Sequence, residues 1–305
     1  MILQFNTGID VGNGFSKYQG GRFASKVKLG SLSTADVSNN SEVHQVIYED
    51  VEYIVGDESG ASFMNENRYF SKYYLIALLT SIALASGTPN STIKANVVIG
   101  VPVDDYNISG DKVAEHFNNI KETKEITVDG HLYRIEIKHV TVFIEGAYPI
   151  ASQNNKHIIT IDVGAGTINV IEWKNQEIVN KFTIRGAFRK LHKDVVEFIN
   201  AKHGTRLQVK DADKVIGKKE INTPNGKVDI TEINEIVDLT ISEHASTIRD
   251  SFGVDLCDAI EICGGGAEKT YDYWNKYFPK AEKVNESQFA NQRVYQAVAK
   301  SVYGE

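Results

Sequence analysis

The sequence predicts an α/β protein built as two similar halves, and three glycine-rich segments carry this prediction. Two of them are acidic turns with the pattern Asp-x-Gly-x-Gly, at residues 10–14 and 162–166, and each lies between two apolar strand-like runs. They are separated by about half of the 305-residue chain. The third is a glycine run at residues 264–266 that joins an apolar strand to a helix-like segment. If the two halves fold alike, both acidic turns should face one cleft.

The acidic turns have the chemistry of a site for Mg²⁺ and phosphate. Glycines let phosphate oxygens approach the backbone N–H groups, while the carboxylate needs a cation between itself and the phosphates. Mg²⁺ keeps several waters and takes one or two carboxylates. We therefore expect Asp10 and Asp162 to hold Mg²⁺ through water, and Lys17 to reach a phosphate as a point charge. The other residues expected at the phosphates are Gly12, Asn13, Gly14, Gly164, Ala165, Gly166 and Thr167.

Ordinary alternatives exist for each segment. A single Asp-x-Gly-x-Gly is a common hairpin turn, but two copies in matching context favour a shared role. A strand follows each acidic turn, which excludes Rossmann and Walker loops because those need a helix after the glycines. In the glycine run, Gly264, Gly265 and Gly266 would let a flat ligand lie against bare backbone at a helix N-terminus. The alternative is a tight strand-to-helix turn.

The elements of the first half alternate strands and helices. Strands are predicted at residues 2–5, 15–18 and 23–29, with a turn at Gly20-Gly21, and a helix at 68–85. A strand at 95–102 ends at a proline, a helix follows at 111–120, and Asp129-Gly130 turns a hairpin.

The second half repeats this plan. Strands flank Asp162 and continue through residues 168–173 and 177–183. Helices are predicted at 187–202, 231–251 and 286–302. Aromatic residues after the glycine run suit either a subunit interface or packing of a helix on its own sheet: Tyr271, Tyr273, Trp274, Tyr277 and Phe278.

Together these segments resemble the actin superfamily of ATPases. Residues 10–17 keep actin's spacing of Asp, two glycines and Lys, residues 162–167 match the second phosphate loop, and residues 262–267 match the adenosine loop. The resemblance implies an actin-like, duplicated RNase H-like two-domain fold with a nucleotide cleft between the domains. It also implies ATP or GTP, with Mg²⁺, as cofactors.

The resemblance also implies domain limits. Domain I would cover 1–150, with the first phosphate loop and a small insert at about 31–95, and would be completed by a C-terminal helix at 286–305. Domain II would cover 151–285, with the second phosphate loop, the adenosine loop and an insert at about 192–250. The chain would cross between domains near 145 and near 285, so both crossings would act as hinges.

Further site residues follow from the resemblance. Residues 140–148 fall where the family's first connecting helix begins and carries a Glu or Gln that orients the attacking water. Glu145, with Asp162, is thus the catalytic candidate, although an acid at a helix start also suits the helix dipole. Ala165 replaces an acidic residue of actin, so no direct metal contact carries over there. Lys214 and Lys218 lie about where adenine contacts arise, but solvated surface lysines are the favoured interpretation.

Within the superfamily, the chain resembles ParM-type bacterial actins, notably at residues 53–57 and 287–295. This implies an actin-like ATPase that polymerises into dynamic filaments with ATP and disassembles after hydrolysis, for plasmid or DNA segregation. The alternative is a small-molecule kinase of the sugar or pantothenate type, which needs a further aspartate base that is not evident here. A chaperone or cell-division scaffold would need a substrate-binding domain or a C-terminal membrane helix, and we expect neither.

Composition bounds the partners. A net charge of −7 argues against broad direct binding to nucleic acid, so DNA would be reached through a separate adaptor protein, and the chain's other partner would be itself. The longest apolar stretch, residues 73–86, is too short to span a membrane and predicts a helix buried in a domain core. The start lacks signal-peptide features, so we expect a cytoplasmic protein. Cys257 and Cys263 are predicted on one strand as free buried thiols.

Overall fold

The computed structural model describes residues 1–32, 41–62, 67–146, 156–224 and 226–304. The chain forms two compact units. Unit 1 comprises Met1–Glu145 and Asn291–Glu305, and unit 2 comprises Gly146–Ala290.

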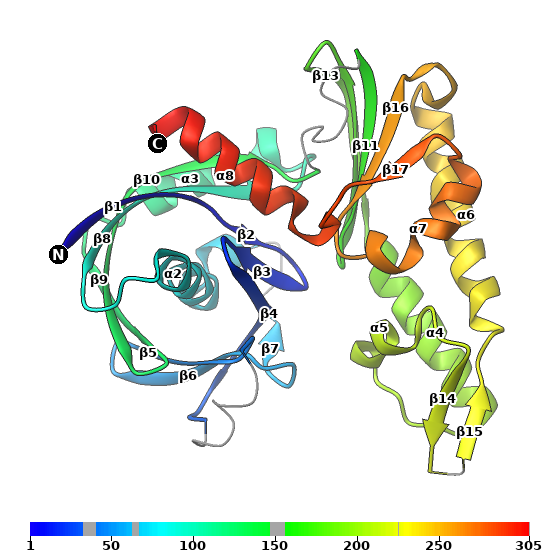
Figure 1. The fold of residues 1–305 in the computed structure, drawn as a ribbon, viewed down its shortest axis with the longest axis horizontal. Helices are drawn as coiled ribbons and strands as arrows, with labels where there is room; N and C mark the ends of the chain where they lie inside the picture. The colour runs from blue at the N-terminus through cyan, green and yellow to red at the C-terminus, as the bar shows by residue number, and fades with distance from the viewer. Residues whose placement is uncertain (33–40, 63–66, 147–155, 225, 305) are drawn as a thin grey trace. The chain divides into compact units, whose positions relative to one another are not determined.

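Unit 1 is built on a ten-stranded sheet with the order β1-β8-β10-β9-β5-β6-β4-β3-β2, and β7 pairs with β4. β1, β8 and β10 are parallel and the remaining pairs are antiparallel. β1 and β2 are consecutive in the chain but lie at opposite ends of this order, so the sheet curls round on itself (Figure 1). The strands are β1 (Ile2–Gly8), β2 (Asp10–Val11), β3 (Phe15–Tyr18), β4 (Gly21–Leu29), β5 (His44–Tyr48), β6 (Val51–Gly56), β7 (Ala61–Ser62), β8 (Thr92–Val101), β9 (Lys124–Val128) and β10 (His131–Ile144).

Helix α2 (Lys72–Ser86) lies inside the curled sheet (Figure 1). Its sequence is apolar all round, which is typical of a helix that is buried on every side, and its side chains from Ile76 to Ala83 are buried. Ser71 caps its N-terminus, because the Ser71 Oγ accepts a hydrogen bond from the Tyr74 N–H at 3.1 Å. The prediction of a buried core helix is therefore confirmed. No helix in the described part of the chain is long and apolar enough to cross a membrane.

Helix α8 (Ala290–Tyr303) completes unit 1 by packing against β1 and β8. Two glycines permit this contact: a Cβ on Gly8 would lie 2.1 Å from the Gln296 nitrogen, and a Cβ on Gly100 would lie 2.0 Å from the Tyr295 Oη. The Gly8 N–H donates to the Gln296 Oε1 at 2.9 Å, and the Gln292 Nε2 donates to the Gly8 carbonyl at 3.1 Å. The last helix thus satisfies backbone groups of the first strand.

Unit 2 has a five-stranded sheet, β13-β12-β11-β16-β17, and a separate hairpin, β14-β15. β11, β16 and β17 are parallel, while β12 and β13 are antiparallel to their neighbours. The strands are β11 (His157–Val163), β12 (Thr167–Lys174), β13 (Glu177–Arg185), β14 (Glu220–Thr223), β15 (Gly226–Asp229), β16 (Ala259–Cys263) and β17 (Ala281–Lys283). The helices are α4 (Ala187–His203), α5 (Ala212–Val215), α6 (Ile233–Ser251) and α7 (Ala267–Tyr277), with the short turns η2 (Val209–Asp211), η3 (Val254–Leu256) and η4 (Ser287–Phe289).

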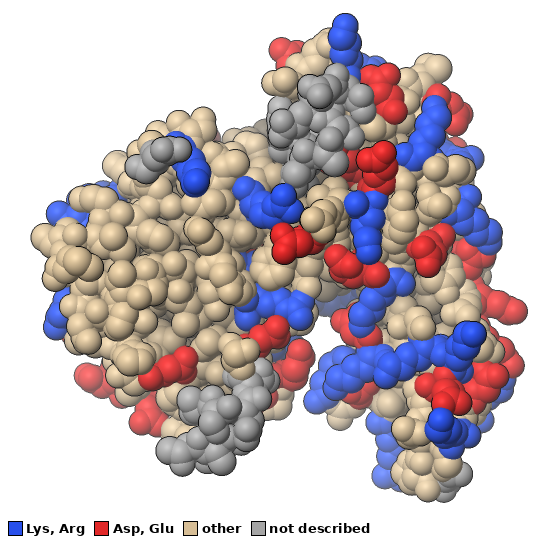
Figure 2. All heavy atoms as spheres, in the orientation of Figure 1, with Lys and Arg blue, Asp and Glu red and all other residues tan. Residues whose placement is uncertain are grey.

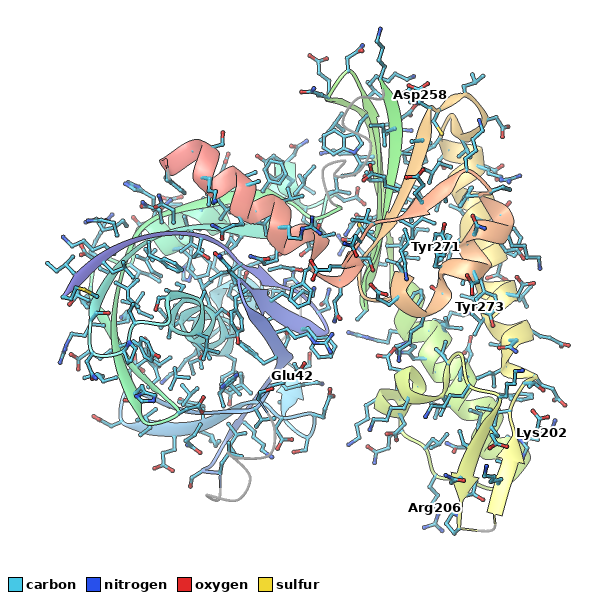
Figure 3. The ribbon with its side chains drawn as sticks, in the orientation of Figure 1. Glu42, Lys202, Arg206, Asp258, Tyr271 and Tyr273 are labelled. Atoms are coloured by element: carbon cyan, nitrogen blue, oxygen red, sulfur yellow. The ribbon has the colours of Figure 1, made fainter. Side chains whose placement is uncertain are left out.

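The aromatic residues after the glycine run pack within unit 2. Trp274 and Phe278 are fully buried and stack at 6.3 Å between ring centroids. Tyr271 and Tyr273 extend from α7 toward β17 and α6, where their hydroxyls donate to the Ala281 carbonyl and the Asn234 Oδ1, each at 2.7 Å (Figure 3). Packing of the helix on its own sheet, the second interpretation given for these residues, therefore accounts for this aromatic group.

Three local predictions need correction. Helix α3 (Tyr106–Asn118) begins before the predicted start at residue 111, because the N–H groups of Ile108 and Ser109 already donate to the Asp105 carbonyl. The helix predicted at 286–302 is a short turn, η4, followed by α8. The cysteines are free and buried as expected, but Cys257 lies before β16, where its thiol donates to the Val254 carbonyl at 3.0 Å, and only Cys263 is on the strand.

Candidate functional site

The first acidic turn, Asp10–Gly14, connects β2 to β3 in unit 1. Asp10 and Lys17 are direct cross-strand partners, and the Lys17 Nζ lies 2.7 Å from the Asp10 Oδ2. Both side chains are largely buried, at 5% exposure for Asp10 and 12% for Lys17. Lys17 therefore neutralises the carboxylate that the sequence assigned to magnesium; its contact with phosphate stays a prediction.

The backbone of this turn packs closely against its neighbouring residues. The Gly12 N–H donates to the Phe15 carbonyl at 3.1 Å, and a Cβ on Gly12 would lie 3.3 Å from both the Asp10 Oδ1 and the Lys17 Nζ. Asn13 and Gly14 are half-buried. Ser25 on β4 holds the turn by two hydrogen bonds. Its Oγ donates to the Gly12 carbonyl at 2.6 Å, and its N–H donates to the Gly14 carbonyl at 2.9 Å. Sequence reasoning missed Ser25, because only strand pairing brings it to the turn.

The second acidic turn, Asp162–Gly166, connects β11 to β12 in unit 2. Asp162 is 5% exposed near the carboxyl end of β11. The Gly164 N–H donates to the carbonyl of Thr167, the first residue of β12, at 2.8 Å. Gly166 accepts a hydrogen bond from the Gly186 N–H at 2.8 Å, and Ala165 is exposed at the tip. The local hydrogen-bond pattern thus repeats that of the first turn, where Gly12 donates to Phe15.

The glycine run, Gly264–Gly266, lies against the second acidic turn. β11 and β16 are parallel neighbours, so their carboxyl ends meet at one edge of the sheet, with Asp162 paired to Cys263. Gly264 has φ +90°, and a Cβ there would lie 2.4 Å from the Asp162 Oδ1. The Gly266 N–H donates to the Val163 carbonyl at 2.8 Å. The Asp162 carboxylate and bare backbone therefore meet within unit 2.

Ser287 holds the glycine run from the other side. Its Oγ lies 3.2 Å from the Gly264 carbonyl and 2.7 Å from the Glu268 Oε1, while the Gly264 N–H donates to the Ser287 carbonyl at 2.9 Å. The Ser287 hydrogen bond, with help from Lys283, holds the pKa of the Glu268 carboxyl below its usual value. The sequence contained no signal for this role, because Ser287 reaches the run only through the fold.

Lys214 and Lys218 lie beside the start of α7, which follows the glycine run. Lys214 is on α5 and pairs with Asp211 at 3.4 Å, and both lysines are exposed. Together with Lys269 in the first turn of α7 they line a hollow of about 390 Å³. The Lys269 Nζ also donates to the Asp213 carbonyl, which ties α7 to α5. Lys269 was not predicted from the sequence. Because it lies shortly after the glycine run and contacts α5, it shows that Lys214 and Lys218 lie near that run.

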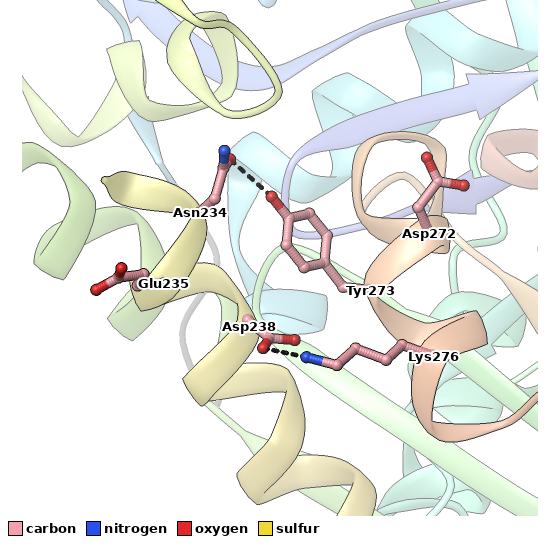
Figure 4. Close-up of a pocket in the computed structure, with 6 residues that line it drawn as sticks. All are labelled: Asn234, Glu235, Asp238, Asp272, Tyr273 and Lys276. Carbon is pink, nitrogen blue, oxygen red and sulfur yellow. Dashed lines mark hydrogen bonds and ion pairs between the residues drawn. The ribbon is translucent and has the colours of Figure 1, made fainter. Parts of the chain in front are cut away.

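A second hollow in unit 2 lies between α6 and α7 and has a volume of about 370 Å³ (Figure 4). Its polar side chains bridge the two helices: the Tyr273 hydroxyl donates to Asn234 at 2.7 Å, and the Lys276 Nζ lies 2.5 Å from the Asp238 Oδ2. The Lys276 bond lowers the pKa of the Asp238 carboxyl. These bridges hold α6 and α7 together, so we assign this hollow a structural role.

Glu145 follows the last residue of β10 in unit 1. Its N–H donates to the Val101 carbonyl at 2.7 Å, which continues the pairing of β10 with β8. The side chain is 8% exposed, and its Oε1 accepts a hydrogen bond from the Arg68 Nη2 at 2.8 Å. Arg68 was not predicted. The connecting helix expected after Glu145 falls on residues 147–155, outside the described part of the chain.

Each acidic turn offers one carboxylate that could hold a hydrated Mg²⁺. Among the described residues there is no group of three or more His, Cys, Asp or Glu side chains that could hold a metal directly. In each unit one aspartate, Asp10 or Asp162, lies beside glycine backbone, which would suit a cation that keeps its waters and takes few protein ligands.

Comparisons with known proteins identify chains with a similar fold. Residues 8–147 match the family model described as the N-terminal domain of actin-like proteins. A non-polymerisable quadruple mutant of pCBH ParM has a TM-score of 0.80 at 19% identity, over 98% of this chain and 99% of that one. The ParM of a 15-stranded filament from Clostridium botulinum gives 0.79 at 18%, over 97% and 99%. An archaeal actin homologue in complex with ADP gives 0.74 at 16%, over 97% and 99%.

A comparison with curated protein sequences found no match. At identities below one fifth, the structural matches show the fold, and they do so over nearly the whole chain. Residues 8–147 are therefore similar to the N-terminal domain of actin-like proteins, and the chain as a whole has an actin-like fold of the ParM kind.

Proposed function

We propose that this chain is an actin-like ATPase that assembles into filaments with ATP and Mg²⁺ and disassembles after hydrolysis. The observation that supports this best is the contact between Asp162 and the glycine run, where a Cβ on Gly264 would lie 2.4 Å from the carboxylate. A strand-end carboxylate beside bare backbone suits a magnesium-bound polyphosphate, because the cation lies between the carboxylate and the phosphates.

In this proposal the nucleoside lies against Gly264–Gly266, with Lys214, Lys218 and Lys269 at the nearby hollow. Both acidic turns would present backbone N–H groups to the phosphates. The residues involved would include Asn13 in the first turn and Ala165 and Thr167 in the second. Bound Mg²⁺ would supply positive charge for the phosphate oxygens, held through water by Asp10 and Asp162.

Lys17 and Asp10 would change partners when nucleotide binds. Lys17 now neutralises Asp10 at 2.7 Å in a largely buried pair. A phosphate is a stronger anionic partner for the ammonium group, and a hydrated cation is a stronger partner for the carboxylate. Each charge thereby keeps a partner of opposite sign, so nucleotide binding leaves neither group buried and unpaired.

Glu145 would accept a hydrogen bond from the attacking water and orient it toward the terminal phosphate. Phosphoryl transfer depends mainly on positioning and on stabilisation of charge, so a fixed carboxylate suits this role. The fixed backbone of Glu145, paired to Val101, and the Arg68 hydrogen bond both restrict its position.

Filament formation is proposed from the relatives, among which are a 15-stranded ParM filament and a ParM mutant described as non-polymerisable. The biological role would be plasmid or DNA segregation in the cytoplasm. The chain carries a net charge of −7, and basic and acidic side chains are interspersed on the face of unit 2 seen in Figure 2. DNA would therefore be held by a separate binding adaptor, because an acidic protein is repelled by the phosphate backbone.

The test is light scattering and pelleting after addition of ATP and Mg²⁺. Wild type should assemble, Asp162→Ala should lose nucleotide binding, and Glu145→Ala should assemble but persist, because hydrolysis is slow. Asp255→Ala is the matched control, since it removes an exposed carboxylate of unit 2 from η3. A wild-type protein that stays monomeric at tens of micromolar, or Asp162→Ala that binds ATP like wild type, would refute the proposal.

A further inference from the structure

Arg68 and Glu145 form a buried ion pair in unit 1. The two residues are 77 positions apart in the sequence, and they are 5% and 6% exposed. The Arg68 Nη2 lies 2.8 Å from the Glu145 Oε1. Burying two charges is costly, and such pairs are often replaceable by apolar residues without loss of stability. Stability alone therefore gives a weak reason for a charged pair at this position.

The guanidinium of Arg68 is held in a fixed position. Arg68 opens the short turn η1 (Arg68–Phe70), and the Ser71 Oγ, which also caps α2, donates to the Arg68 carbonyl at 2.8 Å. The guanidinium lies over the Tyr69 ring at 4.7 Å, and its Nη2 donates to the Tyr69 hydroxyl at 2.6 Å. That hydroxyl in turn donates to the Gly100 carbonyl on β8 at 3.2 Å. Arg68 is thus anchored to the same strand that carries the Glu145 backbone through Val101.

The pair controls both the charge and the orientation of Glu145. A carboxyl group this deeply buried would be driven toward its protonated form by desolvation, and a nearby positive charge opposes that effect. Burial lowers the pKa of the Arg68 guanidinium, but Tyr69 and Glu145 outweigh burial and raise it, so Arg68 stays charged. A protonated Glu145 could not accept a proton from water, and an unanchored one would occupy several rotamers.

We propose that Arg68 is a positioning residue for hydrolysis, which orients the Glu145 carboxylate and keeps it ionised for the attacking water. This assignment rests on the proposed function, specifically on the role of Glu145. Arg68 would not contact the nucleotide, so its removal should lower kcat and leave ATP affinity unchanged. A role in folding alone would instead leave kcat unchanged in whatever protein remains folded.

The experiment is a double-mutant cycle that measures kcat for ATP hydrolysis and Kd for ATP in soluble protein. The variants are Arg68→Gln, Glu145→Gln and the double variant, with Arg68→Lys as the conservative replacement. Arg22→Gln is the matched control, because Arg22 pairs with Glu42 at 2.9 Å in a half-exposed ion pair of the same unit.

We expect Arg68→Gln to lower kcat at least about tenfold, less than the roughly 10²–10⁴-fold that a general base contributes because Glu145 itself remains, with Kd for ATP within about twofold of wild type. In the Glu145→Gln background the same change should have no further effect on kcat, because the group it positions is gone. Arg68→Lys should recover part of the rate, since it keeps the charge but loses the planar fork. Arg22→Gln should match wild type.

Three results would overturn the assignment: an unchanged kcat in folded Arg68→Gln, effects of Arg68→Gln and Glu145→Gln that multiply, or a Kd that rises as much as kcat falls. If Arg68→Gln does not fold, Arg68→Lys and the neutral double variant decide by the same criteria. Different results would refute the proposed function and the role of Arg68. A wild-type protein that binds no ATP removes the proposed function, whereas normal wild-type hydrolysis with an indifferent Arg68 removes only this inference.

Discussion

Replacement of Gly264 by alanine tests the contact on which the proposed nucleotide site depends. Gly264 has φ +90°, where a residue with a Cβ is strained by about 1–2 kcal/mol. The new methyl group would also lie 2.4 Å from the Asp162 Oδ1 and 2.5 Å from the Val163 carbonyl oxygen, well inside van der Waals contact. Overpacking of this kind costs about 1–3 kcal/mol, so the total loss of stability should be about 2–5 kcal/mol.

Gly204→Ala provides the control for backbone strain. Gly204 ends α4 at φ +63°, and a Cβ there would meet nothing within 4 Å. This variant should lose only the strain of about 1–2 kcal/mol. The difference between the two variants then measures the clash with Asp162 and Val163.

Urea unfolding followed by tryptophan fluorescence is the appropriate assay, because both tryptophans of the chain, Trp173 and Trp274, lie in unit 2. ATP titration should show a second difference: Gly264→Ala displaces the Asp162 carboxylate and weakens binding, whereas Gly204→Ala binds like wild type. Equal destabilisation by the two alanines, or normal ATP affinity of Gly264→Ala, would refute the reasoning.

Three further variants test other contacts. Lys17→Met leaves the buried Asp10 carboxylate unpaired, so urea unfolding should show a loss of about 3 kcal/mol, and calorimetry should show weaker ATP binding. Unaltered stability would mean that the 2.7 Å pair contributes nothing. Ser287→Ala removes the hydroxyl that holds the glycine run, and should cost about 1–2 kcal/mol together with ATP affinity. A stability loss without any change in ATP binding would separate Ser287 from the site. For Asp57, burial would raise the pKa, but hydrogen bonds from Lys28 and Ser59 outweigh it and hold the pKa at about 2 instead of 3.8. The folded state binds this proton more weakly than the unfolded state, so the stabilisation is complete above about pH 4 and is lost as pH falls toward about 2. The stability gap between wild type and Asp57→Asn, measured by urea unfolding, should therefore shrink across that window, and a constant gap would contradict it.

Local features of the site could be predicted from the sequence because short segments determine them. The acidic turns need only a strand end, an aspartate and glycines, all within a few residues of Asp10 or Asp162. The Asp129-Gly130 hairpin was likewise readable, and the structure has both residues at positive φ between β9 and β10. Helix α2 was recognisable as a core helix because its apolar residues surround the axis.

The remaining features depend on contacts between distant segments. Arg68 meets Glu145 across 77 positions, and neither residue stands in a pattern that points to the other. Lys269 joins Lys214 and Lys218 at one hollow only because α5 packs beside the start of α7. Ser25 and Ser287 are ordinary serines in the sequence, and strand pairing or the chain's return gives them their roles. Periodicity and motif spacing carry no information on such pairs.

The packing of α8 on β1 has a consequence for synthesis on the ribosome. The amide of Gly8 and the bare surface at Gly100 are covered by Gln296 and Tyr295, which are translated after all of unit 2. One side of β1 therefore stays uncovered until unit 2 and the start of α8 have been made. Unit 2 is encoded within one uninterrupted segment and can fold first, although unit 1 begins earlier. Released chains that end just before residue 291 should accordingly hold a finished second unit and an unfinished first one.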